Sequence, residues 1–144
     1  MSVIRSKRQE SVVEFINTAR ELCSYSIKQC AKIPKRYRFF ISTDIANIAN
    51  NVLDCVVRTN SIHPTNQHEF QIKHDLIVEA ISGCESLVSK ITLAEEIVGF
   101  DEHTMKEWMR LVSTELRLLR GVKKRNIEQR KAANNVTTQS DEVK

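Results

Sequence analysis

The most informative stretch of this sequence runs from Pro34 to Ile62 and reads PKRYRFFISTDIANIANNVLDCVVRTNSI. Its apolar residues recur at alternating spacings of four and three, which is the period of one side of an α-helix and not of a strand. This seam consists of Ile41, Ile45, Ile48, Val52, Cys55, Thr59 and Ile62. Polar residues recur at helical spacing on the opposite side, namely Asp44, Asn47, Asn51, Asp54 and Arg58. The stretch therefore predicts a helix over residues 35–61 with one buried and one solvated side.

Three further segments show the same helical spacing, over residues 7–32, 67–98 and 102–124. Because the chain has only three Gly and two Pro in 144 residues, few positions interrupt these helices. Short connections between them make each helix run antiparallel to the one before it. The sequence therefore predicts one all-α domain, an antiparallel up-down-up-down four-helix bundle over residues 1–125. The basic and polar composition of residues 126–144 predicts a flexible, disordered tail.

Local signals support these boundaries. Gly99 is a typical helix stop, and Asp101 is a typical N-cap for the fourth helix. Thr65 or Asn66 is expected to cap the third helix. Gly83 lies in the middle of the third helix, where it costs about 1 kcal/mol relative to Ala. We interpret Gly83 as a point of close approach to a neighbouring helix.

The fourth predicted helix has two apolar stripes on adjacent faces. The expected inner seam consists of Met105, Met109, Val112, Leu116 and Leu119. The second stripe is interrupted by Glu115 and consists of Trp108, Leu111, Leu118 and Val122. Two interpretations are equally favoured, a wide face buried inside the bundle or a contact between subunits of a homo-oligomer.

Charge is distributed unevenly along the chain. Residues 1–38 hold nine Lys and Arg against three Asp and Glu, residues 39–116 hold five against twelve, and residues 117–144 hold eight against three. In an up-down-up-down bundle, the start of the first helix and the end of the fourth lie at the same end. The predicted nucleic-acid-binding residues gather there: Arg5, Lys7, Arg8, Arg117, Arg120, Lys123, Lys124 and Arg125.

This basic end has two possible origins. Cations at a helix C-terminus are favoured by the helix dipole and aid solubility. That accounts for Lys123 and Lys124, but positive charge at the start of a helix is unfavourable, so it does not account for Arg5, Lys7 and Arg8. A phosphate-binding surface, salt-dependent and with little sequence readout, accounts for both sets.

Other function classes find little support in the sequence. No apolar run approaches the roughly 18 residues of a membrane span, and the first residues lack the apolar segment of a secretion signal, so we expect a cytoplasmic protein without membrane contact. The four cysteines lie on apolar seams without a C-x-x-C pair, which favours buried thiols over a metal or redox site. No Glu-x-x-His pair for a di-iron centre and no nucleophile or phosphate-loop motif occurs. We expect no catalytic residues, no metal and no cofactor, and hence a protein that is not an enzyme.

The turn between the first two helices carries a resemblance to a known family. Ile33-Pro34-Lys35-Arg36-Tyr37-Arg38-Phe39-Phe40 is similar to a hydrophobic-Pro-Lys turn followed by a charged, aromatic-containing turn and a long apolar helix. Asn60-Ser61-Ile62 and the stretch from Leu118 to Lys124 fit the wider pattern, and the likeness covers about residues 5–125. The family is that of small four-helix-bundle proteins that include the accessory variability proteins of diversity-generating retroelements and the proteins encoded in intervening sequences of ribosomal RNA genes.

The resemblance implies a ring-like homo-oligomer, often a pentamer, with a positive surface. In the accessory members of the family it also implies binding to a reverse transcriptase and to nucleic acid within a mobile element. The leading hypothesis is thus a non-enzymatic oligomeric bundle that binds RNA or DNA, or a nucleoprotein partner, without sequence specificity. The alternative is a protein-interaction or structural module that has no nucleic-acid role.

Overall fold

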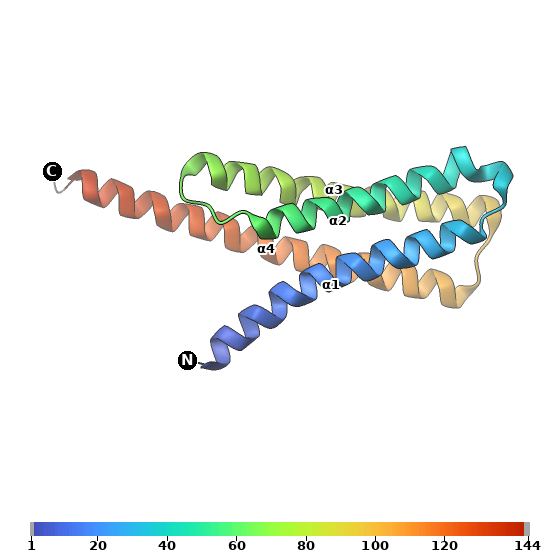
Figure 1. The fold of residues 1–144 in the computed structure, drawn as a ribbon, viewed down its shortest axis with the longest axis horizontal. Helices are drawn as coiled ribbons and strands as arrows, with labels where there is room; N and C mark the ends of the chain where they lie inside the picture. The colour runs from blue at the N-terminus through green and yellow to red at the C-terminus, as the bar shows by residue number, and fades with distance from the viewer. Residues whose placement is uncertain (1, 143–144) are drawn as a thin grey trace.

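The computed structural model describes the backbone of residues 2–142 and the side chains of residues 14–136. Four α-helices make up most of it: α1 (Ser2–Lys32), α2 (Thr43–Ser61), α3 (Gln67–Val98) and α4 (Glu102–Glu142). Each helix runs antiparallel to the one before it, and α1 packs against both α2 and α4 (Figure 1). Since every regular element of the described chain is helical, the predicted all-α four-helix bundle is confirmed.

The turn after α1 differs from the prediction of a continuous helix from residue 35. A 3-10 turn (Lys35–Tyr37) is followed by a π-helical turn (Arg38–Ser42), and α2 begins only at Thr43. Pro34 has an extended ψ of 142°, which ends α1 before the chain reverses. Ile33 before this connection and Ile41 within the π turn are both buried, and Ile41 is 3% exposed. The wide π turn lets both side chains reach the core across a very short connection.

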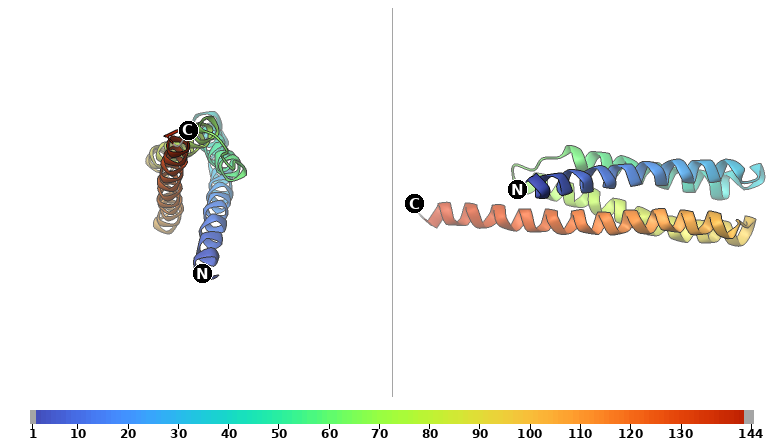
Figure 2. Two further views of the ribbon diagram at one scale, coloured as in Figure 1. Left: turned by 90° about the vertical axis from the view of Figure 1, so that its left-hand side faces the viewer. Right: turned by 90° about the horizontal axis from the view of Figure 1, so that it is seen from below.

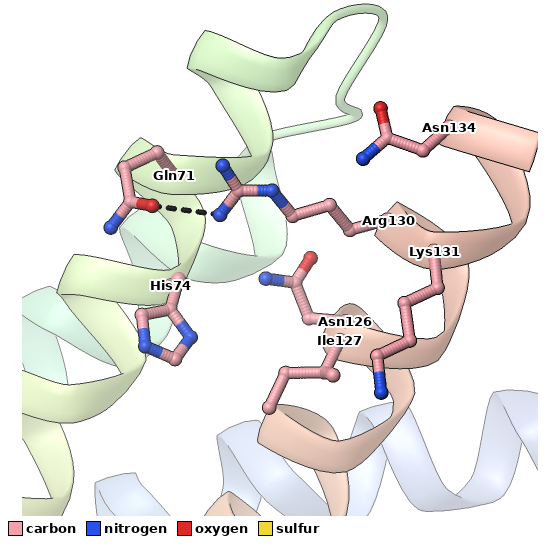
Figure 3. Close-up of a pocket in the computed structure, with 7 residues that line it drawn as sticks. All are labelled: Gln71, His74, Asn126, Ile127, Arg130, Lys131 and Asn134. Atoms are coloured by element: carbon pink, nitrogen blue, oxygen red, sulfur yellow. Dashed lines mark hydrogen bonds between the residues drawn. The ribbon is translucent and has the colours of Figure 1, made fainter. Parts of the chain in front are cut away.

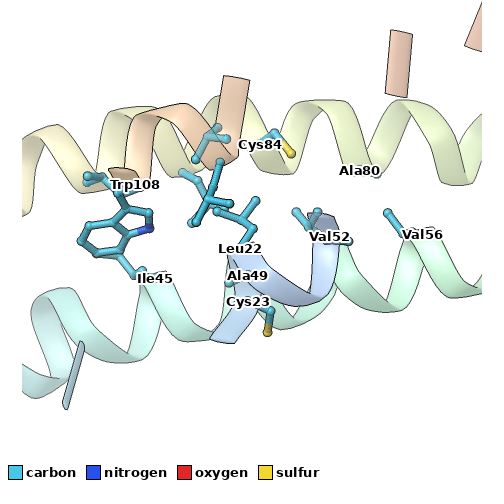
Figure 4. Close-up of a cluster of buried hydrophobic side chains, with 14 of the residues drawn as sticks. Leu22, Cys23, Ile45, Ala49, Val52, Val56, Ala80, Cys84 and Trp108 are labelled. Carbon is cyan, nitrogen blue, oxygen red and sulfur yellow. The ribbon is translucent and has the colours of Figure 1, made fainter. Parts of the chain in front are cut away.

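The core runs along the contact of all four helices (Figure 4). Leu22 of α1, Ile45 and Val52 of α2, and Cys84 of α3 are fully or almost fully buried. A Cβ built on Gly83 would lie 2.7 Å from Cγ2 of Val52, closer than real Cβ contacts allow. The predicted close approach at Gly83 is therefore confirmed, and the neighbour is α2.

The predicted helix ends are confirmed where α3 and α4 begin and where α3 stops. Asn66 accepts a hydrogen bond from the Glu69 backbone N–H at 2.9 Å, so Asn66 is the N-cap of α3. Asp101 accepts one from the Thr104 N–H at 2.7 Å, and this bond is the main reason that the pKa of Asp101 is lowered. Gly99 ends α3 with a φ of 81°, which other residues rarely adopt.

The fourth helix does not end near residue 124 as predicted, because α4 continues without interruption to Glu142. Asn126 is only 2% exposed, and its Nδ2 donates a hydrogen bond to the Phe70 carbonyl at 3.3 Å. Arg130, one turn further, bonds two glutamines of α3. These contacts with the start of α3 hold the second half of α4 against the bundle.

The two chain ends and the α2–α3 connection lie at one end of the bundle, as predicted (Figure 1). We call this the basic end. The first turns of α1 lean away from α4, so the two termini are well separated when the molecule is viewed from this end (Figure 2). The start of α1 and the end of α4 therefore lie at the same end of the bundle but not next to each other.

Candidate nucleic-acid interface

The part of α4 between residues 117 and 136 is strongly basic. Residues 117–136 contain seven Lys and Arg and a single acidic residue, Glu128. Arg117, Arg120 and Lys124 follow one another at spacings of three and four, so they share one face of the helix. All three lie toward solvent, and Val112 and Leu119 on the opposite face are fully buried in the core. We call Arg117, Arg120 and Lys124 the basic ridge.

Little negative charge compensates these residues. Among the described side chains, the only ion pair from this part of α4 joins Arg120 Nη2 to Glu85 Oε1 of α3 at 3.5 Å. Both partners are more than half exposed, and such surface pairs contribute little. The pKa of Lys73 of α3 is lowered first by burial and then by the charge of Arg125, which lies nearby on α4. The predicted cations of α4 thus form a surface with uncompensated positive charge.

The other predicted nucleic-acid-binding residues lie at the start of α1. The side chains of Arg5, Lys7 and Arg8 lie outside the described part of the chain. Their backbone belongs to the portion of α1 that leans away from α4 (Figure 2). The candidate interface that the structure describes is therefore the α4 surface alone.

The prediction of a subunit contact is wrong for Trp108 and Leu111, two of the four residues of the second apolar stripe. Trp108 is 0% exposed and Leu111 is 3% exposed within the single chain, so neither can reach another subunit. The Trp108 indole Nε1–H donates to Ser26 Oγ of α1 at 2.9 Å, and the rings of Tyr25 and Phe100 contact the indole edge to face. Leu118 and Val122 are half-buried and pack against the same core.

The stripe centred on Trp108 is thus the inner face of α4. Met105, Met109 and Leu116, which the sequence pattern assigned to the inner seam, are half-buried at its edge. For Trp108 and Leu111, the interpretation of the second stripe as a wide buried face is the correct one.

Glu115 lies in the middle of this inner face. It is 0% exposed, and neither of its carboxylate oxygens has a hydrogen-bond partner among the described residues. Burial raises its pKa to about 8, so the side chain is protonated at neutral pH. Cys84 of α3 lies nearby, and the pKa of its thiol is raised to about 12 by burial and then by the Glu115 charge.

Burial is the only cause of the Glu115 pKa shift, so no second acid among the described residues contributes to it. Among the residues that the structure describes, no group of three or more His, Cys, Asp or Glu could hold a metal ion. The four cysteines are free thiols, and burial raises the pKa of each one. A raised thiol pKa leaves little thiolate, the form that binds metals and reacts with oxidants.

The opposite end of the bundle carries an exposed aromatic pair that the sequence pattern did not single out as a site. Phe39 and Phe40, in the π turn, are 80% and 74% exposed. Lys35, Arg36 and Arg38 beside them form no ion pair among the described side chains. The exposure of the two rings follows from the π turn, which a helical pattern over residues 35–61 does not predict.

The structure also shows a pocket between α3 and α4 at the basic end (Figure 3). It has a volume of about 340 Å³, and Gln71 and His74 of α3 and Asn126, Arg130 and Lys131 of α4 contribute to its wall. The sequence prediction missed Asn126 because a polar residue at that position resembles the end of the apolar pattern. Its spacing of four from Val122 and seven from Leu119 continues the apolar rhythm and could have revealed it.

Comparisons with known proteins identify no relative: no family model, no curated protein and no solved structure matches this chain. The resemblance to the retroelement accessory proteins therefore stays a prediction. Within the described residues, no helix combines the length and the apolar character that crossing a membrane requires.

Proposed function

We propose that this chain is a non-enzymatic, homo-oligomeric four-helix-bundle protein that binds nucleic acid, or a nucleoprotein partner such as a reverse transcriptase, through the segment of α4 between residues 117 and 136. The observation that carries the proposal is the surplus of cations on that segment, with one surface ion pair among its described side chains. Such a surface attracts the phosphate backbone of RNA or DNA by releasing counterions.

The expected binding has little sequence specificity. Long basic side chains on a helix contact phosphates, whereas reading a sequence requires hydrogen bonds to base edges. No aromatic ring lies among the basic residues of α4 between 117 and 136, so stacking on unpaired bases is not expected at the basic ridge.

The test replaces Arg117 and Lys124 of the basic ridge by Glu. We expect a loss of affinity of at least about tenfold for an RNA or DNA oligonucleotide at low salt, measured by fluorescence anisotropy, because two phosphate contacts become repulsive. Neutralising the same two residues to Gln should reduce the slope of log K against log salt by about 1.4 to 1.8. Wild-type binding that does not respond to salt, or that survives the charge reversal, would refute the proposal.

A matched control comes from the first half of the same helix. Lys106 and Arg110 are also exposed cations of α4, but they pair with Glu102 at 3.3 Å and with Glu107 at 2.6 Å. Replacing Lys106 and Arg110 by Glu changes the net charge of the protein by the same amount. We expect this variant to bind nearly as well as wild type, which separates the basic ridge from an effect of net charge.

A second candidate function is a protein-interaction module, which the exposed pair Phe39 and Phe40 favours. Two neighbouring aromatic rings with three cations beside them are a typical anchor for a protein partner that carries acidic residues. Light scattering of the wild type and of a Phe39→Ser, Phe40→Ser variant tests whether this turn is instead a contact between copies of the chain. A wild-type monomer would remove homo-oligomerisation from the first proposal, and an oligomer that the substitutions dissociate would assign the contact to this turn.

A further inference from the structure

The pocket between α3 and α4 differs from the basic ridge in that one of its cations is held in place. Arg130 Nε donates to Gln67 Oε1 at 2.8 Å, and Arg130 Nη1 donates to Gln71 Oε1 at 2.7 Å. Gln71 is itself oriented, because its Nε2 donates to Asp75 Oδ1 at 2.8 Å. The guanidinium of Arg130 is thus held by two neighbours from α3, and Figure 3 shows the bond to Gln71.

The two neighbours that hold Arg130 are neutral. An arginine held by a carboxylate, as Arg110 is by Glu107, has its charge compensated by the same contact that orients it. The amide oxygens of Gln67 and Gln71 orient Arg130 without removing its net charge. A fixed and uncompensated guanidinium is well suited to bind an anion with paired oxygen atoms, such as phosphate.

Other polar side chains contribute to the wall of the pocket. They include His74 from α3 and Lys131 from α4, although the Lys131 ammonium points away from the guanidinium of Arg130 (Figure 3). The hollow has a volume of about 340 Å³, which is larger than one phosphate ion requires.

The pocket also contains an acceptor that lacks a donor. Asn126 is 2% exposed, and its Nδ2 is satisfied by the Phe70 carbonyl, which fixes the orientation of the amide. Its Oδ1 is buried and has no hydrogen-bond partner among the described residues. An unsatisfied buried acceptor is unfavourable, and a ligand with a hydroxyl group beside its anionic group would satisfy it.

We propose that this pocket binds a phosphorylated sugar, with the phosphate on Arg130 and a sugar hydroxyl donating to Asn126 Oδ1. Two sources offer this chemistry, a free sugar phosphate or nucleotide and a nucleotide within an RNA strand. The proposal does not depend on binding at the basic ridge, because Arg117 and Lys124 do not line the pocket.

The probe is ribose 5-phosphate, added to the ¹⁵N-labelled full chain and followed by the side-chain amide signals of Asn126 and Gln71. We expect saturable shifts of these signals, and binding at least about tenfold weaker in an Arg130→Gln variant, because the main phosphate contact is lost. Arg110→Gln is the control, an arginine of the same helix held by a carboxylate, and should bind like wild type. Circular dichroism of both variants checks that they are folded.

Three outcomes would overturn the proposal: no shift of the Asn126 and Gln71 signals, unchanged binding in Arg130→Gln, or sulfate binding as tightly as ribose 5-phosphate. Sulfate tests the hydroxyl, since it has the charge and shape of phosphate dianion without a sugar. A variant with Arg117→Gln and Lys124→Gln should bind ribose 5-phosphate normally, so failure at the basic ridge is recognised separately.

A competing oligoribonucleotide identifies the source. Displacement of ribose 5-phosphate by the oligonucleotide in the wild type, together with weaker oligonucleotide binding in Arg130→Gln, supports the pocket as a contact for an RNA strand. Simultaneous binding of both supports it as a site for a free sugar phosphate or nucleotide.

Discussion

Two polar side chains on the inner face of α4, Trp108 and Glu115, have opposite environments. Both are 0% exposed and lie two helical turns apart. The indole N–H of Trp108 has a partner on α1, the hydroxyl of Ser26, whereas the two oxygens of Glu115 have none among the described residues. A polar group in this core therefore fixes how two helices pair only where the opposite helix supplies its hydrogen-bond partner.

Trp108 and Glu115 also differ in how each avoids the free-energy penalty of burying a polar group. The Trp108–Ser26 bond satisfies the indole donor, so the large ring can be buried without a penalty for its N–H. Glu115 avoids the greater penalty of a buried charge by keeping its proton at neutral pH. This protonation makes the stability of the bundle sensitive to pH.

The largest effect is expected from Glu115→Leu. Burial raises the Glu115 pKa from 4.5 to about 8, so between these values the folded chain holds a proton that the unfolded chain releases. The free energy of unfolding of the wild type should therefore fall by about 1.4 kcal/mol per pH unit over this interval, with the full contribution present below it. The Leu variant should lack this slope and exceed wild type in stability, increasingly so as the pH rises.

Urea unfolding followed by circular dichroism, between about pH 5 and about pH 8, measures this slope. Glu96→Leu, at an exposed position of α3, is the control and should retain the wild-type slope. Equal slopes in wild type and Glu115→Leu would mean that Glu115 is not the titrating group.

A smaller effect is expected from Ser26→Ala, which makes the environment of Trp108 resemble that of Glu115. The indole N–H would be left buried without an acceptor, and the free energy of unfolding should fall by about 1–3 kcal/mol. Ser24→Ala, on the exposed side of α1, should change it by less than about 0.5 kcal/mol. If both variants are equally stable, the hydrogen bond of Trp108 does not contribute to the pairing of α1 and α4.

The smallest effect is expected from Gly83→Ala. This variant tests a steric contact, whereas Glu115→Leu and Ser26→Ala test buried polar groups. The new methyl group would collide with Val52, at a cost of about 1–3 kcal/mol, and the gain in helix propensity offsets about 1 kcal/mol of it. We expect a net loss of about 1 kcal/mol in urea unfolding.

Two further variants check the steric cause. Gly121→Ala, where a Cβ meets nothing within 4 Å, should instead stabilise α4 by about 1 kcal/mol. Combining Gly83→Ala with Val52→Ala should cost less than the sum of the single changes. Additive effects would show that Gly83 is not needed for the approach of α2.

The sequence predicted the helical architecture well because each helix shows its own spacing of apolar residues. The caps at Asn66 and Asp101 and the stop at Gly99 were also predictable, since they act over three or four residues. Gly83 was interpretable because a glycine in the middle of a long helix lowers helix stability and is tolerated where a neighbour needs the space. All of these signals are local, and the structure confirms them.

The errors concern features that depend on distant neighbours. Asn126 continues α4 because its amide finds the carbonyl of Phe70, 56 residues earlier, and no local pattern shows that partner. The inner face of α4 is centred on Trp108 because Ser26 lies opposite, 82 positions away. The π turn before Thr43 depends on how Ile33 and Ile41 both reach the core. The pocket at Arg130 likewise requires the start of α3 and the second half of α4 to be placed side by side.

The 82-residue separation of Ser26 and Trp108 also bears on the order in which the chain folds. Helices adjacent in sequence pack as hairpins and close short loops, whereas the contact of α1 with α4 closes most of the chain. We expect this contact to form after the transition state. Loss of the Ser26 hydroxyl should then speed unfolding and leave the folding rate almost unchanged.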